Sequence, residues 1–206
     1  MDERRLQFKV ISELMQYPDE GFMKRLPHVE TAVAELPEEL REKIEGFISF
    51  IKCQSPIRLQ ETYTAAFCIN SKTTLNMAYH HWGNSEKRAL ALAGLEQVYR
   101  EAGYERIGGE LPDFLPLMLE FLSINPDAPG AELVRQCLSG PERLSAQLRE
   151  TAPGYAVLFD TLACILSDQN EKEAPRGVGA QKEHARVADL IGGAPAEEGE
   201  DHGSCS

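Results

Sequence analysis

The stretch ELPDFLPLMLEFLS, residues 110–123, decides the fold. Most of its residues are Leu, Met or Phe, and its only charged residues are the acids Glu110, Asp113 and Glu120. After the prolines, apolar residues fall on every side of a helix, and a helix that is apolar all round lies in the centre of its bundle. The stretch therefore predicts a buried central helix with one carboxylate, Glu120, in its middle.

Two prolines stand at the entrance of this predicted helix, at Pro112 and Pro116. Between them, Asp113 is a natural N-cap, because its carboxylate can accept a hydrogen bond from the free amides of the first turn. If Asp113 caps, Pro116 is the third helical residue, whose N–H would have no partner inside the helix. The prolines thus predict a rigid entrance rather than a break.

Apolar residues recur at helical spacing in most of the chain before residue 170. Pro37 begins one clear helix, because proline suits the first turn. The apolar face of that helix is Leu40, Ile44, Phe47, Ile48 and Ile51. Asn84 or Ser85 caps a second clear helix, which Gly103 ends. Further helices are predicted at about 6–17, 20–35, 56–68, 129–138, 141–150 and 153–168, and no alternating run predicts a strand.

These patterns predict an all-α fold, a single-domain helical bundle of about eight to ten helices over residues 1–169. Residues 170–206 are rich in Gly, Ala, Glu and Pro and contain few large aliphatic side chains. They bury too little apolar surface to offset an ordering entropy of roughly 1–2 kcal/mol per residue. We therefore expect a flexible acidic tail there.

The charge balance restricts the partners. The 206 residues include 33 acids and 21 bases, which gives a net charge of −12. Such a surface repels nucleic acid and anionic lipid and favours basic partners. The sequence begins without a signal-peptide core, and no apolar run approaches the roughly 20 residues that span a bilayer. We expect a cytoplasmic protein that does not insert into the membrane.

Catalytic and metal-binding motifs are absent from the sequence. The five cysteines are scattered without a CxxC pair. On a helix, the adjacent His80 and His81 would point about 100° apart, which does not suit a shared metal ion. Neither a GxSxG motif nor the spacing of a P-loop occurs. These features predict no enzymatic activity and no metal site, with a helical metal-binding protein as the alternative.

Four blocks, in the expected order, carry a resemblance to a known family. Residues 110–123 resemble the signature of the redox-enzyme maturation chaperones, the superfamily that includes TorD and DmsD. Within it they are most similar to the NarJ branch, which assembles membrane-bound respiratory nitrate reductase. LQETYTAAFCIN (59–70) and the block at 74–105 are similar to further segments of that branch, and an acidic tail is usual there. The similarity extends over residues 5–165.

The resemblance implies a TorD-like, all-helical cytoplasmic chaperone without enzymatic activity. Such proteins bind the N-terminal segment of the nitrate reductase catalytic subunit. They hold the apoenzyme competent for insertion of the molybdenum cofactor before membrane docking, and bind no cofactor stably themselves. Many members have Asp-His where this chain has Asp113 and Phe114, so a role of that histidine does not carry over. A different molybdoenzyme client, such as a sulfoxide or amine-oxide reductase, stays open, as does a monomer or a domain-swapped dimer.

A chaperone for a short, basic, partly helical peptide needs an apolar groove and carboxylates. The candidate peptide-binding residues are Glu61, Tyr63, Tyr79, His80, Trp82, Asp113, Phe114, Leu117 and Glu120. Among them, Asp113, Leu117 and Glu120 share a helix face, where the two acids would line a cleft for a positively charged segment. In the alternative reading, Asp113 only caps its helix and Glu120 pairs with an internal arginine.

Two aromatic candidates also have alternative readings. Tyr63 lies one helical turn before Phe67, which we predict to be core, but the Tyr63 hydroxyl needs a partner or a wet edge and so favours the groove. Trp82 could stack on an arginine of the guest peptide, with simple packing as the alternative.

Overall fold

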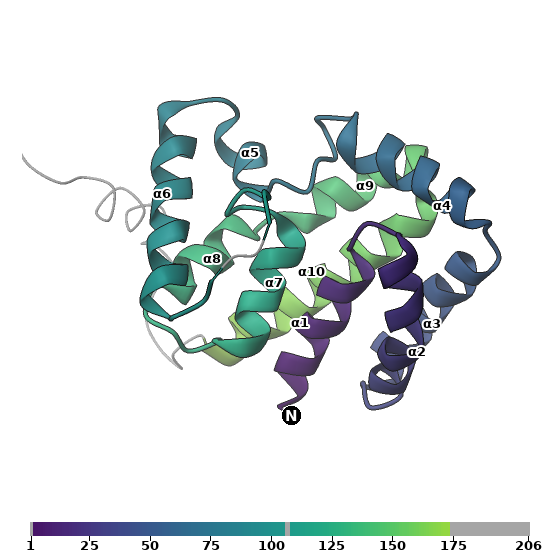
Figure 1. Ribbon diagram of the computed structural model, residues 1–206. Coiled ribbons are helices and arrows are strands. Elements are labelled where there is room, and N and C mark those ends of the chain that lie inside the picture. The colour runs from purple at the N-terminus through teal and green to yellow at the C-terminus, as the bar shows by residue number, and fades with distance from the viewer. Residues whose placement is uncertain (1, 106–107, 174–206) are drawn as a thin grey trace, which may run out of the picture. The chain divides into compact units, whose positions relative to one another are not determined.

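The computed structural model describes residues 2–105 and 108–173, which form ten α-helices and one π-helix (Figure 1). In order they are α1 (Glu3–Leu14), α2 (Glu20–Val33), α3 (Glu38–Lys52), α4 (Pro56–Tyr63), the π-helix η1 (Thr64–Cys68), α5 (Met77–Trp82), α6 (Glu86–Glu101), α7 (Leu115–Ile124), α8 (Ala131–Cys137), α9 (Pro141–Thr151) and α10 (Pro153–Glu173). The predicted all-α fold is confirmed. The last helix continues past the predicted boundary at residue 169, and most of the predicted tail lies outside the described residues.

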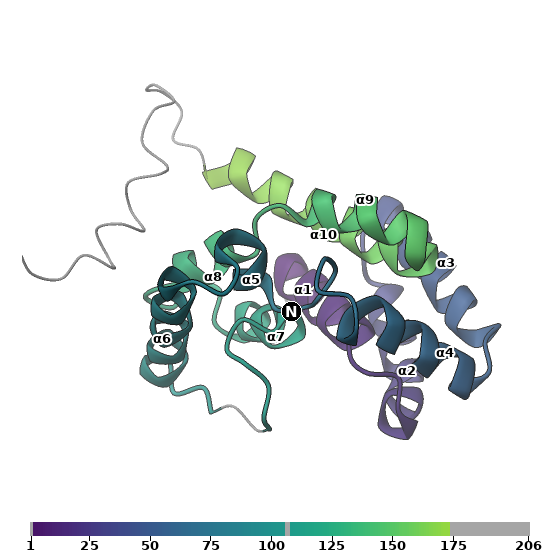
Figure 2. The ribbon, with the colours of Figure 1, turned by 90° about the horizontal axis from the view of Figure 1, so that it is seen from above.

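Helices α1 and α7 pack against each other in the middle of the bundle (Figure 2). On one side α5, α6 and α8 pack together and meet α7 through α8. On the other side α1 contacts α2, α2 contacts α3, and α10 runs along α9 and α3. No helix in the described part of the chain combines the length and the apolar character that crossing a membrane requires. The predicted central helix is therefore confirmed in position, with α1 as its main neighbour.

Helix α3 forms as its sequence predicts. Pro37 is its N-cap residue, and Glu38 and Glu39 occupy the first turn, where the helix dipole favours acids. All five residues of its predicted apolar face are buried: Leu40, Ile44, Phe47, Ile48 and Ile51. Full burial of one such side chain contributes about 1.5–3 kcal/mol relative to exposure. This face is what fixes α3 onto the core.

Helix α6 also follows the prediction, with Ser85 at the N-cap position and Gly103 just past the end at φ +69°. A left-handed φ suits glycine, which has no Cβ to clash. Within the helix, a Cβ on Gly94 would lie 2.9 Å from the Leu133 side chain of α8. Glycine at this position therefore lets α8 approach α6 closely.

Two segments differ from the prediction. The first helix ends at Leu14, so Tyr17 lies beyond it and is exposed. The six-residue helix α5 was not predicted, and its first amide, that of Met77, donates to the carbonyl of Asp113. A helix this short depends on tertiary contacts, since isolated short helices are marginal in water.

Candidate functional site

Helix α7 is buried on nearly all sides, as its sequence predicts. The buried residues are Leu115, Pro116, Met118, Leu119, Phe121, Leu122 and Ser123. One line of residues is different: Phe114, Leu117 and Glu120 are partly exposed, and Ile124 is 50% exposed. Steps of three and four residues place them along one side of the helix. We call Phe114, Leu117, Glu120 and Ile124 the α7 edge.

The entrance to α7 is set by pairing between two distant parts of the backbone. The Met77 amide donates to the Asp113 carbonyl at 2.9 Å, and the Leu115 amide donates to the Leu75 carbonyl at 2.8 Å. These bonds form an antiparallel bridge between Asn76 and Phe114. Asp113 lies in a turn that the Phe114 amide closes by donating to the Leu111 carbonyl at 3.1 Å, and the extended residue Phe114 is the N-cap residue. The prediction that Asp113 caps α7 is wrong.

Asp113 is fully buried. Its Oδ2 accepts a hydrogen bond from Arg88 Nη2 at 3.2 Å, and the Arg88 guanidinium lies 5.6 Å from the centre of the Tyr79 ring. Burial raises the pKa of Asp113, although the charge of Arg88 acts in the opposite direction. Asp113 therefore does not line an open cleft with Glu120, which corrects that reading. It joins the entrance of α7 to α6.

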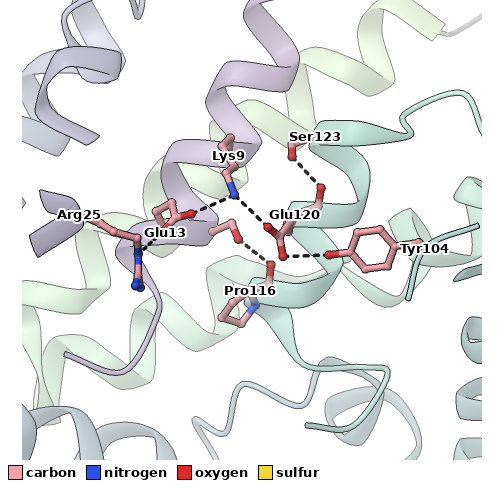
Figure 3. A network of polar contacts seen from close by, with 8 residues as sticks. Lys9, Glu13, Arg25, Tyr104, Pro116, Glu120 and Ser123 are labelled. Carbon is pink, nitrogen blue, oxygen red and sulfur yellow. Dashed lines mark hydrogen bonds and ion pairs between the residues drawn. The ribbon is translucent and has the colours of Figure 1, made fainter. Parts of the chain in front are cut away.

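Glu120 has two partners within its own chain (Figure 3). Its Oε1 accepts from Lys9 Nζ at 2.9 Å, and its Oε2 accepts from the Tyr104 hydroxyl at 2.8 Å. Burial alone would raise the pKa of Glu120, but the Lys9 and Tyr104 hydrogen bonds and the Lys9 charge lower it. The internal pairing predicted as the alternative is present, with a lysine in place of the arginine. The side chain is still 35% exposed, so the carboxylate is reachable from solvent.

The Glu120 pair belongs to a chain of alternating charges on α2, α1 and α7 (Figure 3). Lys9 Nζ also lies 2.9 Å from Glu13 Oε1, and Glu13 Oε2 accepts from Arg25 Nε at 3.0 Å. Close to this network, the Ser12 hydroxyl donates to the Pro116 carbonyl at 2.7 Å. Side chains of α1 thus hold one side of the α7 edge, while Tyr104 holds the other.

Two candidates, Glu61 and Tyr63, belong to α4, and the two ribbon views show α4 apart from α7 (Figures 1 and 2). Glu61 is exposed and lies 3.6 Å from Arg58. Tyr63 is buried, its hydroxyl donates to the Met15 carbonyl at 3.0 Å, and its ring meets Phe67 edge to face. The Tyr63 hydroxyl thus has an internal partner, and the core position predicted for Phe67 is confirmed.

The α5 candidates are held by internal contacts. Tyr79 lies against Arg88, and His80 Nε2 is 2.7 Å from the Thr74 carbonyl oxygen. His81 Nε2 instead lies 3.3 Å from Ser139 Oγ, so the two histidines have different partners. Trp82 is half-buried and packs against the core. Within the described ranges, no three His, Cys, Asp or Glu side chains come together as a metal site would require.

Sequence reasoning missed three residues of this region: Lys9, Arg88 and Tyr104. Arg88 and Lys9 look like ordinary surface residues of amphipathic helices, and Lys9 is separated from its partner Glu120 by 111 positions. The available signal was the position of Asp113 and Glu120 within an apolar stretch, since a carboxylate among apolar neighbours requires a cation or a hydrogen-bond donor. That signal calls for a partner but does not identify one.

The known proteins to which this chain is similar are named for nitrate reductase. The sequence model of the family described as "Nitrate reductase delta subunit" matches residues 33–150, which include the α7 edge. The chain is 30% identical to the probable nitrate reductase molybdenum cofactor assembly chaperone NarJ of Bacillus subtilis, over 85% of this chain and 96% of that protein. It is also 30% identical to NarJ of Escherichia coli K12, over 76% of this chain and 68% of that protein.

A third relative is the probable assembly chaperone NarW of Escherichia coli K12, which is 31% identical over 75% of this chain and 65% of that protein. The resemblance of the four sequence blocks to the NarJ branch is thus confirmed. The chain belongs to the nitrate reductase delta subunit family.

Proposed function

We propose that this protein is an assembly chaperone for a nitrate reductase and binds the N-terminal segment of its catalytic subunit. It would act in the cytoplasm and keep the apoenzyme competent for insertion of the molybdenum cofactor before membrane docking. The observation that carries the proposal is the similarity, along most of the chain, to proteins named as nitrate reductase molybdenum cofactor assembly chaperones. Those names describe chaperones rather than catalysts, in agreement with the expectation of no enzymatic activity.

The α7 edge supports recognition of an amphipathic, basic segment. Phe114, Leu117 and Ile124 offer apolar contact, and Glu120 offers a carboxylate between them. An amphipathic guest helix presents apolar side chains at steps of three and four residues, the same steps that separate the edge residues. The net charge of −12 favours the approach of a basic guest.

The candidate residues divide into two roles under this proposal. Direct contacts are assigned to Phe114, Leu117 and Glu120, with Ile124 and Tyr104 added from the structure. Asp113, Tyr63 and Tyr79 would act by supporting the helices beneath, because their polar groups or rings are engaged within the chain. Glu61, His80 and Trp82 stay candidates for contacts with more distant parts of the guest.

Calorimetric titration of the full chain with a synthetic peptide tests the proposal. The peptide comprises the first ~20 residues of the catalytic subunit, long enough for a helix of about 30 Å. We expect saturable binding with a negative heat-capacity change, because apolar surface is buried. A scrambled peptide and the leading segment of a sulfoxide reductase serve as controls. Absence of binding at millimolar peptide would contradict the proposal.

A pair of variants locates the binding surface. Ile124→Asp places a charge on the α7 edge and should lower peptide affinity about tenfold, through lost apolar contact. Leu90→Asp is the matched control, because Leu90 on α6 is a similarly exposed aliphatic residue, at 44% against 50% for Ile124. Equal losses in both variants would mean that the α7 edge is not the binding surface.

A further inference from the structure

The α7 edge contains one charged residue, Glu120, and that residue already has a basic partner. Lys9 Nζ lies 2.9 Å from Glu120 Oε1, the distance at which a guest's basic group would bind. The side chains of Lys9 and Glu120 are 36% and 35% exposed. A basic guest side chain that approaches Glu120 therefore meets Lys9 at the same oxygen.

The surroundings of Lys9 allow it to leave Glu120 without losing all its partners. Its ammonium is also 2.9 Å from Glu13 Oε1, on the next turn of the same helix. Glu13 Oε2 accepts separately from Arg25. On the other side, the Tyr104 hydroxyl donates to Glu120 Oε2 and so would hold the carboxylate in place during an exchange. Each charged group has a partner both before and after the exchange.

We propose that Lys9 is a built-in competitor for the guest peptide. In the free protein its ammonium occupies the position that a guest arginine takes on Glu120, and the arginine displaces it towards Glu13. This inference rests on the proposed function, since it concerns the same surface. Its consequence is weaker, more readily reversible binding, which suits a chaperone that must release its client.

The size of the effect follows from the exposure of the pair. Pairs open to solvent contribute little, because water and salt screen them. Competition by Lys9 should therefore lower the affinity for an arginine-containing guest by about two- to fivefold rather than prevent binding. A guanidinium can compete because it presents N–H groups in parallel to a carboxylate, whereas an ammonium is a compact point charge.

The test compares Lys9→Met with wild-type protein in calorimetric titrations of the catalytic-subunit peptide. Methionine keeps a similar apolar stem, which preserves packing. We expect Lys9→Met to bind the peptide about two- to fivefold more tightly, and the gain to vanish when the peptide's arginine is replaced by neutral citrulline. Lys9→Arg retains the competing charge and should give no gain.

Lys43→Met is the matched control. Lys43 is 35% exposed, has an acidic partner at 2.8 Å in Glu39, and lies on α3. Lys43→Met changes the net charge by the same amount as Lys9→Met. A gain in peptide affinity shared by both variants would therefore be a general charge effect and would overturn the inference. The inference would also be overturned if the wild-type protein bound the peptide and Lys9→Met, at an unchanged melting temperature, bound it no more tightly. Absence of peptide binding by every form would overturn the proposed function itself.

Discussion

Asp113 and Glu120 come from the same apolar stretch, yet they lie in very different surroundings. Asp113 is fully buried and its partner Arg88 is only 15% exposed, whereas both Glu120 and Lys9 are about one-third exposed. The first pair joins α6 to the entrance of α7, and the second lies at an edge between α1 and Tyr104. Both residues are acids of one apolar stretch, so the packing around each carboxylate decides its role.

The two pairs should also differ in what they contribute to stability. Removing one member of a buried pair leaves an uncompensated charge away from water and costs about 3–5 kcal/mol. Removing one member of a pair open to solvent costs roughly 0–1 kcal/mol. We therefore expect Asp113 to act mainly on folding and Glu120 mainly on binding.

The largest expected effect is that of Asp113→Ala. It leaves Arg88 without its carboxylate and should lower the free energy of unfolding by about 3 kcal/mol or more, as measured by urea denaturation. Adding Arg88→Met should recover part of the loss, because the two residues act as one unit. A loss below about 1 kcal/mol would erase the distinction between the two pairs.

A smaller effect is expected when Glu120→Gln is combined with Lys9→Met. In an otherwise wild-type chain, Glu120→Gln removes the carboxylate that would bind the guest and, with it, the competing pair with Lys9. Peptide affinity should therefore fall by only about twofold. In the Lys9→Met background only the guest loses a partner, and the fall should reach about fivefold, or ~1 kcal/mol.

Calorimetry of the four proteins in this cycle measures the difference directly. Equal losses in the two backgrounds would show that Lys9 and the guest do not share Glu120. Unfolding of each variant is followed in parallel, so that a change in affinity is not confused with a change in folding.

The smallest expected effect is a difference in pH dependence. The pKa of Glu120 is lowered in the folded chain, so its contribution to stability is present above its ordinary pKa and is lost as pH falls through the lowered value. The pKa of Asp113 is raised, so its contribution to stability increases as pH falls through that value. Relative to wild type, Glu120→Gln and Asp113→Asn should therefore show opposite trends between about pH 5 and pH 3. Parallel trends in urea denaturation would contradict these assignments.

Much of the fold could be predicted because local signals were sufficient. Pro37 with two following acids begins α3, and the spacing of its apolar residues alone identifies the buried face. Likewise, the apolar residues that surround Glu120 between positions 117 and 122 predicted that α7 is central. In each case the decisive information lies within one or two turns of the helix.

The details of the candidate site depend on contacts between residues far apart in the sequence. Asp113 fits an N-cap by local rules, but it lies in a turn, and the N-cap is the extended residue Phe114, which bridges to Asn76. The same bridge gives the short helix α5 its starting point at Met77. The pairing of Glu120 with Lys9 requires α1 to pack on α7, which no local pattern of either helix specifies.

Mapping the guest on the folded chain tests the central claim most directly. The claim is that the α7 edge receives the N-terminal segment of the catalytic subunit. Isotope-labelled protein would be titrated with the peptide and followed by NMR chemical shifts. We predict that the largest changes fall on Phe114, Leu117, Glu120 and Ile124, flanked by changes at Lys9 and Tyr104. Saturable binding with its largest changes on α3 or α9, and none along the α7 edge, would contradict the account.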